Sequence, residues 1–222
     1  QVPMVKVTGG QRIDLLGIRK EDLPGVWKDL DMPSGHAYGK SIRTVKTCVG
    51  SEFCRFGTQN STQMGIDLEH ALFNMWSPHK VKLAVSGCPR NCAESGIKDV
   101  GIIGVDSGWE LYIGGNGGIK TEAGEFFVKV KSAEEVMEYS LAFLQLYREE
   151  AFYLERTVHY LQRVGMDHIK QAVLNDAERR KALHQRLLFS LSFEQDPWQE
   201  QLSKPQLKKE FDRIAVKQLE NA

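Results

Sequence analysis

The sequence predicts an α+β fold in which a mixed sheet is followed by a helical C-terminal tail. Short apolar segments typical of strands recur through the middle of the chain, and one long helical stretch, at 58–76, interrupts them. After residue 132 the apolar residues recur at helical spacing instead. Mixed strands and helices of this kind are typical of a layered α+β or α/β domain. The predicted strands are 41–47, 80–85, 100–105, 109–113 and 125–130.

The composition is that of an ordinary globular protein. The chain has 222 residues, 41% of them hydrophobic and 26% charged, with a formal net charge of zero. Such a length suits one or two domains, and the neutral balance favours neither nucleic acid nor a membrane surface as a partner. No apolar run approaches the roughly 20 residues that a membrane span needs, and no signal-peptide pattern opens the chain. We therefore expect a cytoplasmic location.

Turn and capping signals divide the chain. The chain opens in a strand pattern at Val2–Val7, which leads us to expect the C-terminal part of a longer polypeptide. A helix is predicted at 20–30, and the turn residues 33–36 mark a boundary. Ser132 and Glu135 have the spacing of a capping box, and Gly165 ends the helical stretch that follows. The predicted segments are 1–34, 35–165 and 166–222.

Four cysteines form two closely spaced pairs, Cys48-x5-Cys54 and Cys88-x3-Cys92. Disulfides are disfavoured because no export signal is present and a chain of this length buries a core without them. Four thiolates can hold a structural zinc or an iron–sulfur cluster. The five-residue gap fits a zinc knuckle poorly, and neither pair has ferredoxin spacing. A metal cluster is favoured, with zinc and unliganded thiols as alternatives.

The residues around these pairs resemble a known signature. The segments Thr47-Cys48-Val49-Gly50-Ser51-Glu52-Phe53-Cys54 and Ser86-Gly87-Cys88-Pro89-Arg90-Asn91-Cys92 are similar to the paired motif of the siroheme nitrite and sulfite reductases. Further segments, at 8–17, 114–120 and 196–198, resemble the large subunits of bacterial NADH-dependent assimilatory nitrite reductases. The resemblance to the siroheme nitrite and sulfite reductases covers about residues 1 to 170.

The resemblance implies cofactors, partners and a domain arrangement. In this family the four cysteines hold a [4Fe–4S] cluster, and the last, here Cys92, also bridges to the siroheme (heme) iron. Residues 1–34 would end a ferredoxin-like half-domain, 35–165 would bind siroheme and cluster, and 166–222 would form a helical extension. FAD and NAD(P)H are implied for domains preceding this part, and a small subunit is the expected partner.

A site that binds siroheme carboxylates and reduces an anion needs fixed positive charge. Lys80 and Lys82 lie two residues apart on a predicted strand, so their side chains face the same side. An arbitrary Lys-x-Lys is usually a solvated face. The resemblance, however, implies that Lys80 and Lys82 contact the substrate and that Arg43 faces the distal side of the siroheme.

Other candidates for cofactor contact follow from position. Arg12 matches a family segment that binds siroheme carboxylates, and Arg90 and Asn91 lie between two cluster ligands. The loop 114–118 has four glycines in five residues, which allows a close backbone approach to a macrocycle. Asn116 and Gly117 are its predicted contact residues, although a simple hairpin turn is the alternative.

The resemblance implies six-electron reduction of nitrite to ammonia, within nitrate assimilation. Two alternatives stay open: reduction of sulfite to sulfide with the same cofactors, and a non-catalytic iron–sulfur module for electron transfer or interaction. Family enzymes usually combine two related halves, whereas this chain shows one. Either one copy supplies all the site residues or a second copy completes the site in a homodimer.

Overall fold

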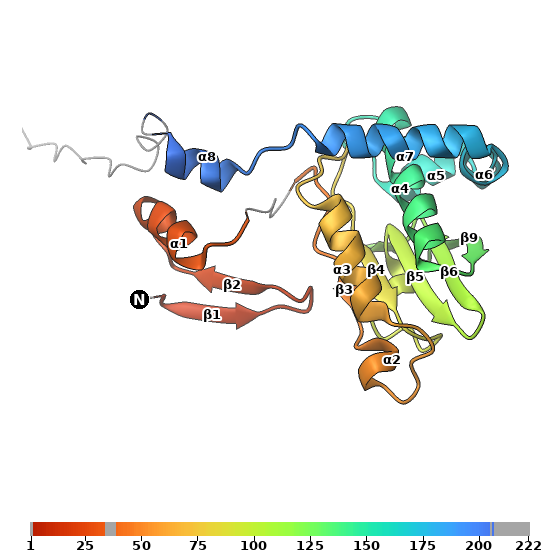
Figure 1. Ribbon diagram of the computed structural model, residues 1–222, viewed down its shortest axis with the longest axis horizontal. Coiled ribbons are helices and arrows are strands. Elements are labelled where there is room, and N and C mark those ends of the chain that lie inside the picture. Colours follow the sequence, from red (N-terminus) through yellow and green to blue (C-terminus); the bar gives the residue numbers. More distant parts are fainter. Residues whose placement is uncertain (1, 34–38, 205, 207–222) are drawn as a thin grey trace, which may run out of the picture. The chain divides into compact units, whose positions relative to one another are not determined.

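A computed structural model describes residues 2–33, 39–204 and 206. The chain divides into two compact units, residues 1–35 with 195–222 (the hairpin unit) and residues 36–194 (the sheet unit). Within the part of the chain that the structure describes, no helix is long and apolar enough to cross a membrane. Figure 1 shows the elements of each unit.

The hairpin unit is built from two strands and two helices. Its elements are β1 (Met4–Val7), β2 (Ile13–Leu16), the 3-10 turn η1 (Lys20–Asp22), α1 (Leu23–Leu30) and α8 (Pro197–Ser203). The strands pair antiparallel, with Met4 opposite Leu16. Trp27 of α1 stacks on Trp198 of α8, with ring centroids 5.2 Å apart. The stack joins segments that lie far apart in the sequence.

The sheet unit contains a five-stranded mixed sheet in the order β3-β4-β5-β6-β9. The strands are β3 (Lys46–Thr47), β4 (Leu83–Ser86), β5 (Val100–Val105), β6 (Gly108–Ile113) and β9 (Glu125–Val130). β3, β4 and β5 are parallel, whereas β6 and β9 are antiparallel additions. The predicted mixed sheet is therefore confirmed, in agreement with the predicted α+β class.

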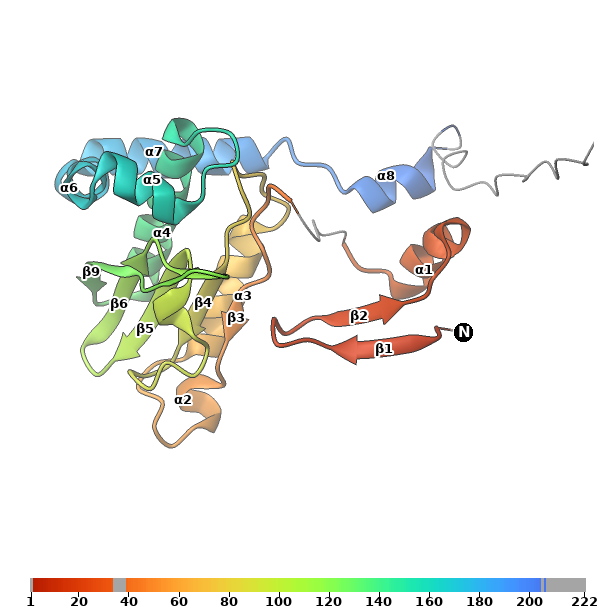
Figure 2. The same ribbon diagram turned by 180° about the vertical axis from the view of Figure 1, so that it is seen from behind.

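Helices cover one face of this sheet. They are α3 (Ser61–Leu72), which packs on β3 and β4, and α4 (Ala133–Glu150), which packs on β6. Figures 1 and 2 show both helices on the same side of the sheet. Alternate residues of the strands, such as Leu83, Val85 and Ile102, are buried beneath them. The loops that carry the cysteines follow the carboxyl ends of β3 and β4.

Local capping explains where the two helices begin. The Asn60 side chain accepts a hydrogen bond from Gln63 N at 3.0 Å, so α3 is shorter than the predicted 58–76. The predicted capping box of α4 is confirmed. Ser132 Oγ accepts from Glu135 N at 3.2 Å, and the Glu135 carboxylate accepts from Ser132 N at 3.1 Å.

The first predicted strand is much shorter in the structure. Only Lys46–Thr47 forms β3, while Ser41 and Ile42 make isolated bridges. The interruption has a cause, because the N–H of Val45 donates to the Glu69 carboxylate of α3 at 2.7 Å rather than to a strand. A ladder bond is thereby replaced by a helix contact, which the alternating pattern did not indicate.

The helical stretch predicted to run to Gly165 is broken at 151–156. Beyond the break the chain forms α5 (Thr157–Val164), α6 (Met166–Lys170), the π-helical turn η3 (Gln171–Asn175) and α7 (Ala177–Leu191). Gly165, with φ +83, ends α5 as predicted. α7 packs along α4 and buries Leu183 and Leu187. α6 and α7, which fall in the predicted extension, therefore lie within the sheet unit.

Candidate functional site

Two loops at the carboxyl ends of neighbouring strands carry all four cysteines. The first cysteine loop, 48–60, follows β3 and contains α2 (Gly50–Phe53). The second cysteine loop, 87–99, follows β4 and contains the 3-10 turn η2 (Ser95–Ile97). β3 and β4 are parallel neighbours, so their carboxyl ends, and the loops that follow, lie side by side.

Direct hydrogen bonds connect the two loops. Gly87 N donates to Cys48 Sγ at 3.1 Å, and the carbonyl of Gly87 accepts from the N–H groups of Thr58 and Gln59. Ser61 Oγ lies 3.2 Å from Cys48 Sγ and donates to the Cys48 carbonyl at 2.9 Å. A network of this density fixes the Cys48 sulfur relative to the second loop.

Glycines allow the loops to approach. A Cβ at Gly87 would lie 2.8 Å from both the Gln59 carbonyl oxygen and the Gly50 Cα. Gly50 itself has φ +64, a conformation that favours glycine, and a Cβ there would lie 2.6 Å from Ser61 N. The glycines around the cysteines therefore have a structural reason.

The environment of Cys48 favours its thiolate. Burial acts to raise the pKa of this thiol, but hydrogen bonds from Ser61 and from the backbone of Gly87 and Gly50 oppose it, and the net pKa is lowered. Donors directed at a sulfur stabilise its negative charge, and a metal ligand must be deprotonated. The position suits a metal-ligating cysteine.

The donor set of the two loops suits an iron–sulfur cluster. All four cysteines are free thiols: Cys88 is buried, Cys48 and Cys54 are half-buried and Cys92 is exposed. Within residues 2–33, 39–204 and 206, no three histidine, cysteine or acidic side chains are placed to hold one metal ion. A [4Fe–4S] cubane takes one thiol on each of its four irons. The four-cysteine donor set fits the cubane.

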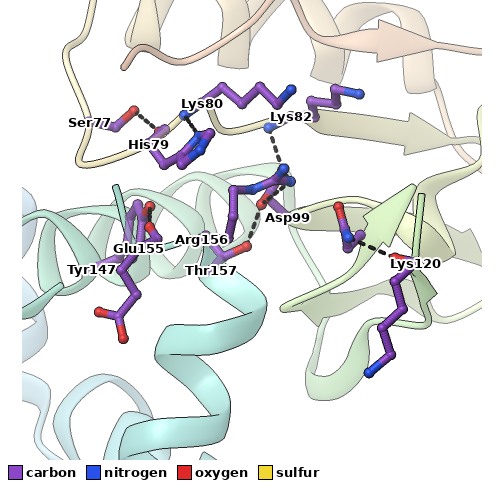
Figure 3. Close-up of polar contacts among 11 residues, drawn as sticks. Ser77, His79, Lys80, Lys82, Asp99, Lys120, Tyr147, Glu155, Arg156 and Thr157 are labelled. Carbon is purple, nitrogen blue, oxygen red and sulfur yellow. Dashed lines mark hydrogen bonds and ion pairs between the residues drawn. The ribbon is translucent and has the colours of Figure 1, made fainter. Parts of the chain in front are cut away.

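Lys80 and Lys82 lie in the extended segment that enters β4. Figure 3 shows their side chains extending in the same direction, as the two-residue spacing predicts. Burial lowers the pKa of Lys82, and the positive charges of Lys80, Lys98 and Arg156 lower it further, while Asp99 raises it. A half-buried ammonium among like charges is suited to releasing a proton and attracting an anion.

Asp99, a residue that the sequence prediction missed, contacts the backbone of residues 80–82, here called the lysine segment. Asp99 accepts from Lys82 N at 2.8 Å and forms an ion pair with Arg156 at 3.2 Å. The hydroxyl of Thr157 also donates to it, as Figure 3 shows. The available signal was a carboxylate directly before an apolar strand, because such a group needs partners if the fold buries it.

Two predicted residues connect parts of the cysteine loops. Asn91, at φ +57, accepts from Gly96 N at 3.1 Å through its side-chain oxygen and so closes the second loop. The Arg90 guanidinium carbon lies 3.9 Å from the ring centroid of Phe56, in the first loop. Arg43 is half-buried, and its N–H donates to Val81 O beside the lysine pair. Contact of these side chains with a cofactor stays a prediction.

The glycine-rich loop packs against the second cysteine loop. Gly115 N donates to the Lys98 carbonyl at 2.9 Å, and a Cβ at Gly115 would lie 2.5 Å from that oxygen. Asn116 and Gly117 form β7 (Asn116–Gly117), which pairs with β8 (Thr121–Glu122), and Asn116 Nδ2 donates to Lys120 O. Close approach to the chain's own backbone thus explains Gly115, and the cofactor role of Asn116 and Gly117 stays a prediction.

Arg12 lies in the hairpin unit, between β1 and β2. Its N–H donates to Thr8 Oγ1 at 3.2 Å, and its carbonyl accepts from Thr8 N. The side-chain Nε is buried and has no hydrogen-bond partner among the described residues. An unsatisfied guanidinium nitrogen is a suitable donor for a carboxylate.

The match to a family model decides the affiliation of the chain. Residues 38–181 match the model described as the nitrite and sulphite reductase 4Fe-4S domain. This chain belongs to that family. The matched range includes both cysteine loops and the lysine segment, so the resemblance inferred from the paired signature is confirmed.

Similar proteins extend this result. The chain is 61% identical over 217 residues to a nitrite reductase [NAD(P)H] of Bacillus subtilis, covering 97% of this chain and 27% of that protein. It thus spans about a quarter of that relative. An assimilatory-type sulfite reductase of Nitratidesulfovibrio vulgaris is 35% identical, over 78% of this chain and 80% of that protein.

A solved structure shows the same fold. The crystal structure of a dissimilatory sulfite reductase I superposes with a TM-score of 0.69 and 16% identity, covering 76% of this chain and 61% of that one. At this identity the likeness shows the fold alone. The fold of this neighbour agrees with the family match and with the mixed sheet of this chain.

Proposed function

We propose that this chain is the siroheme- and cluster-binding part of an NAD(P)H-dependent nitrite reductase large subunit, which reduces nitrite to ammonia in the cytoplasm for nitrate assimilation. The observation that carries the proposal is the pair of cysteine loops, joined by the hydrogen bond from Gly87 N to Cys48 Sγ, within the range that matches the family model. The high identity to a named nitrite reductase supports nitrite as the substrate. FAD and NAD(P)H would bind the preceding domains, and a small subunit would be the partner.

Each group of residues has a role in this proposal. The [4Fe–4S] cluster would be held by Cys48, Cys54, Cys88 and Cys92, and Arg12 would bind siroheme carboxylates through its guanidinium, whose Nε is buried. When bound, the two cofactors supply the electrons of the reduction and the iron that takes the substrate.

The basic residues of this chain supply the remaining chemistry. Lys80, Lys82 and Arg43 would hold the anion by charge, and the lysine ammonium groups would donate protons as each oxygen leaves as water. The lowered pKa of Lys82 supports this role, because an acid works best when its pKa is near the working pH.

The test compares nitrite and sulfite turnover by the full-length enzyme, with ammonium and sulfide measured as products. Ammonium formation that falls at least about tenfold in Lys82→Ala, with Lys181→Ala as the exposed control, supports the proposal. Sulfite turnover without nitrite turnover would favour the sulfite reductase alternative, which the 35% identical relative supports. Normal cluster content without turnover of either anion would favour an electron-transfer module.

A further inference from the structure

Asp99 is a buried carboxylate beneath the lysine pair. Its side chain is 1% exposed, yet it lies directly before β5 and beside the entry to β4. A buried charge is tolerated where several donors satisfy it. Asp99 meets this condition with three partners from two parts of the chain, the backbone at Lys82 and the start of α5.

The first partner is the backbone of the lysine segment. Lys82 N donates to Asp99 Oδ2 at 2.8 Å, at the position where a continuous strand would have used a ladder bond. The carbonyl of Lys82 then accepts from Val100 N at 3.3 Å, so Asp99 and the residue after it hold the same backbone. The direction of the Lys82 side chain is therefore set by Asp99.

The other partners come from the start of α5. Arg156 Nη2 lies 3.2 Å from both carboxylate oxygens, and Thr157, which is fully buried, donates its hydroxyl. The preceding loop is itself tied to the residues just before the lysine segment, because Leu154 N donates to Pro78 O at 3.1 Å. The break between α4 and α5 thus brings a cation and a hydroxyl to Asp99.

Charge adds to the geometry. The groups that act on the Lys82 ammonium are Lys80 on its own segment, Lys98 on the second cysteine loop, Arg156 at α5 and Asp99. Three of these four are cations, and Asp99 is the anion among them. Removing its charge would leave Lys82 half-buried among positive groups, and Arg156 would lose its counterion.

We propose that Asp99 is the positioning residue of Lys82, fixing its backbone and supplying the one carboxylate of the group formed by Lys80, Lys98, Arg156 and Asp99. The inference rests on the proposed function for the role of Lys82 as a proton donor. The arrangement of Asp99, Arg156 and Thr157 around the lysine backbone does not depend on that function.

The experiment uses the full-length holoenzyme and four variants. Asp99→Asn removes the charge, Arg156→Gln removes the opposing cation, and Thr157→Val removes one hydrogen bond while leaving both charges. Asp106→Asn makes the same exchange on an exposed turn and serves as the control. Siroheme absorption bands and iron content establish that each variant is assembled.

Two readouts are followed against pH. One is the alkaline limb of kcat for nitrite, and the other is the titration of Lys82 by NMR after ¹³C-methylation of lysines, assigned with Lys82→Arg. We expect Asp99→Asn to move both to lower pH by about one unit, the smaller end of the effect of one close charge. Arg156→Gln should move both to higher pH, and Thr157→Val should lower thermal stability without moving either.

Opposite shifts in Asp99→Asn and Arg156→Gln support the inference, and unchanged titration of Lys82 in both overturns it. A uniform loss of kcat at every pH would reduce Asp99 to a structural role. If Asp99→Asn does not assemble, the upward shift in Arg156→Gln still decides the matter. If the wild-type enzyme does not reduce nitrite, the proposed function fails, while the NMR titration still tests Asp99.

Discussion

Gly87 donates its backbone N–H to the Sγ of Cys48 at 3.1 Å, which connects the loop after β4 to a cysteine of the loop after β3. The two cysteine pairs are separated by 33 intervening residues in the sequence. The loops that carry them lie side by side because β3 and β4 are parallel neighbours. The position of Cys48 Sγ therefore depends on the backbone N–H of Gly87, the residue directly before the second cysteine pair.

Gly87→Ala should disrupt this connection. A Cβ would lie 2.8 Å from backbone atoms of Gly50 and Gln59, which cannot move as a flexible side chain would. We expect the loops to separate at a cost of about 1–3 kcal/mol, the usual range for overpacking, and the iron content per chain to fall. Gly25→Ala is the matched control, because a Cβ there meets nothing within 4 Å. Wild-type iron content in Gly87→Ala would contradict the prediction.

The pH dependence of turnover should show Lys82. Its pKa is lowered, mainly by burial and then by neighbouring cations, so the ammonium loses its proton below the ordinary lysine value of about 10.4. Nitrite turnover should therefore be retained at lower pH and decline as the pH rises through this lowered pKa. In Lys82→Arg the alkaline decline should disappear while turnover falls at every pH, since a guanidinium stays charged but does not release a proton. An identical alkaline limb in Lys82→Arg and in the exposed control Lys181→Arg would exclude Lys82 as its source.

Motif spacing was enough to predict local features within one segment, such as the shared direction of the Lys80 and Lys82 side chains and the capping box. The cysteine pairs, the lysine pair and the capping box each depend on neighbours no more than a few residues away, and local geometry carries such patterns directly. The same holds for the strands at 100–105, 109–113 and 125–130, which match β5, β6 and β9 closely.

The rest depended on contacts between distant segments. Asp99 and Arg156 lie 57 positions apart, and no periodicity relates them. The predicted helix to Gly165 is apolar at helical spacing on both sides of the break at 151–156, so the pattern alone could not reveal the break. The glycine loop shows the same limit, since its close approach is to Lys98 of this chain. The sequence indicated that the backbone of the loop 114–118 allows a close approach, but it did not indicate which group approaches it.

Trp198→Ala should release α8 from α1 within the hairpin unit. The stacked pair, 5.2 Å between centroids and 13° between planes, is worth about 0.5–1.5 kcal/mol beyond its buried area. Limited proteolysis should then cut the segment 195–204 earlier than in the wild type, while the sheet unit stays protected. Trp198→Phe keeps an aromatic ring and should retain most of the protection. Equal cleavage rates in wild type and Trp198→Ala would show that the stack does not hold α8.

Tyr147→Phe tests whether the loop that presents Arg156 is held from within the core. Tyr147 is fully buried in α4, and its hydroxyl donates to the Glu155 carbonyl at 2.5 Å. Burial raises the pKa of this phenol, so it stays a protonated donor at any working pH. Without the hydroxyl the carbonyl loses a partner, which costs about 1–3 kcal/mol.

The effect should be local as well as thermodynamic. We expect a lower melting temperature and faster amide hydrogen exchange in residues 152–156, because the Tyr147 bond is one of those that hold this loop. Tyr112→Phe is the control, since its hydroxyl donates to Glu110 on the same strand, away from the loop. Exchange that rises equally in both variants would mean that the loop depends on general stability rather than on Tyr147. Exchange confined to the loop would show that one buried hydroxyl supports the segment on which the Asp99–Arg156 pair depends.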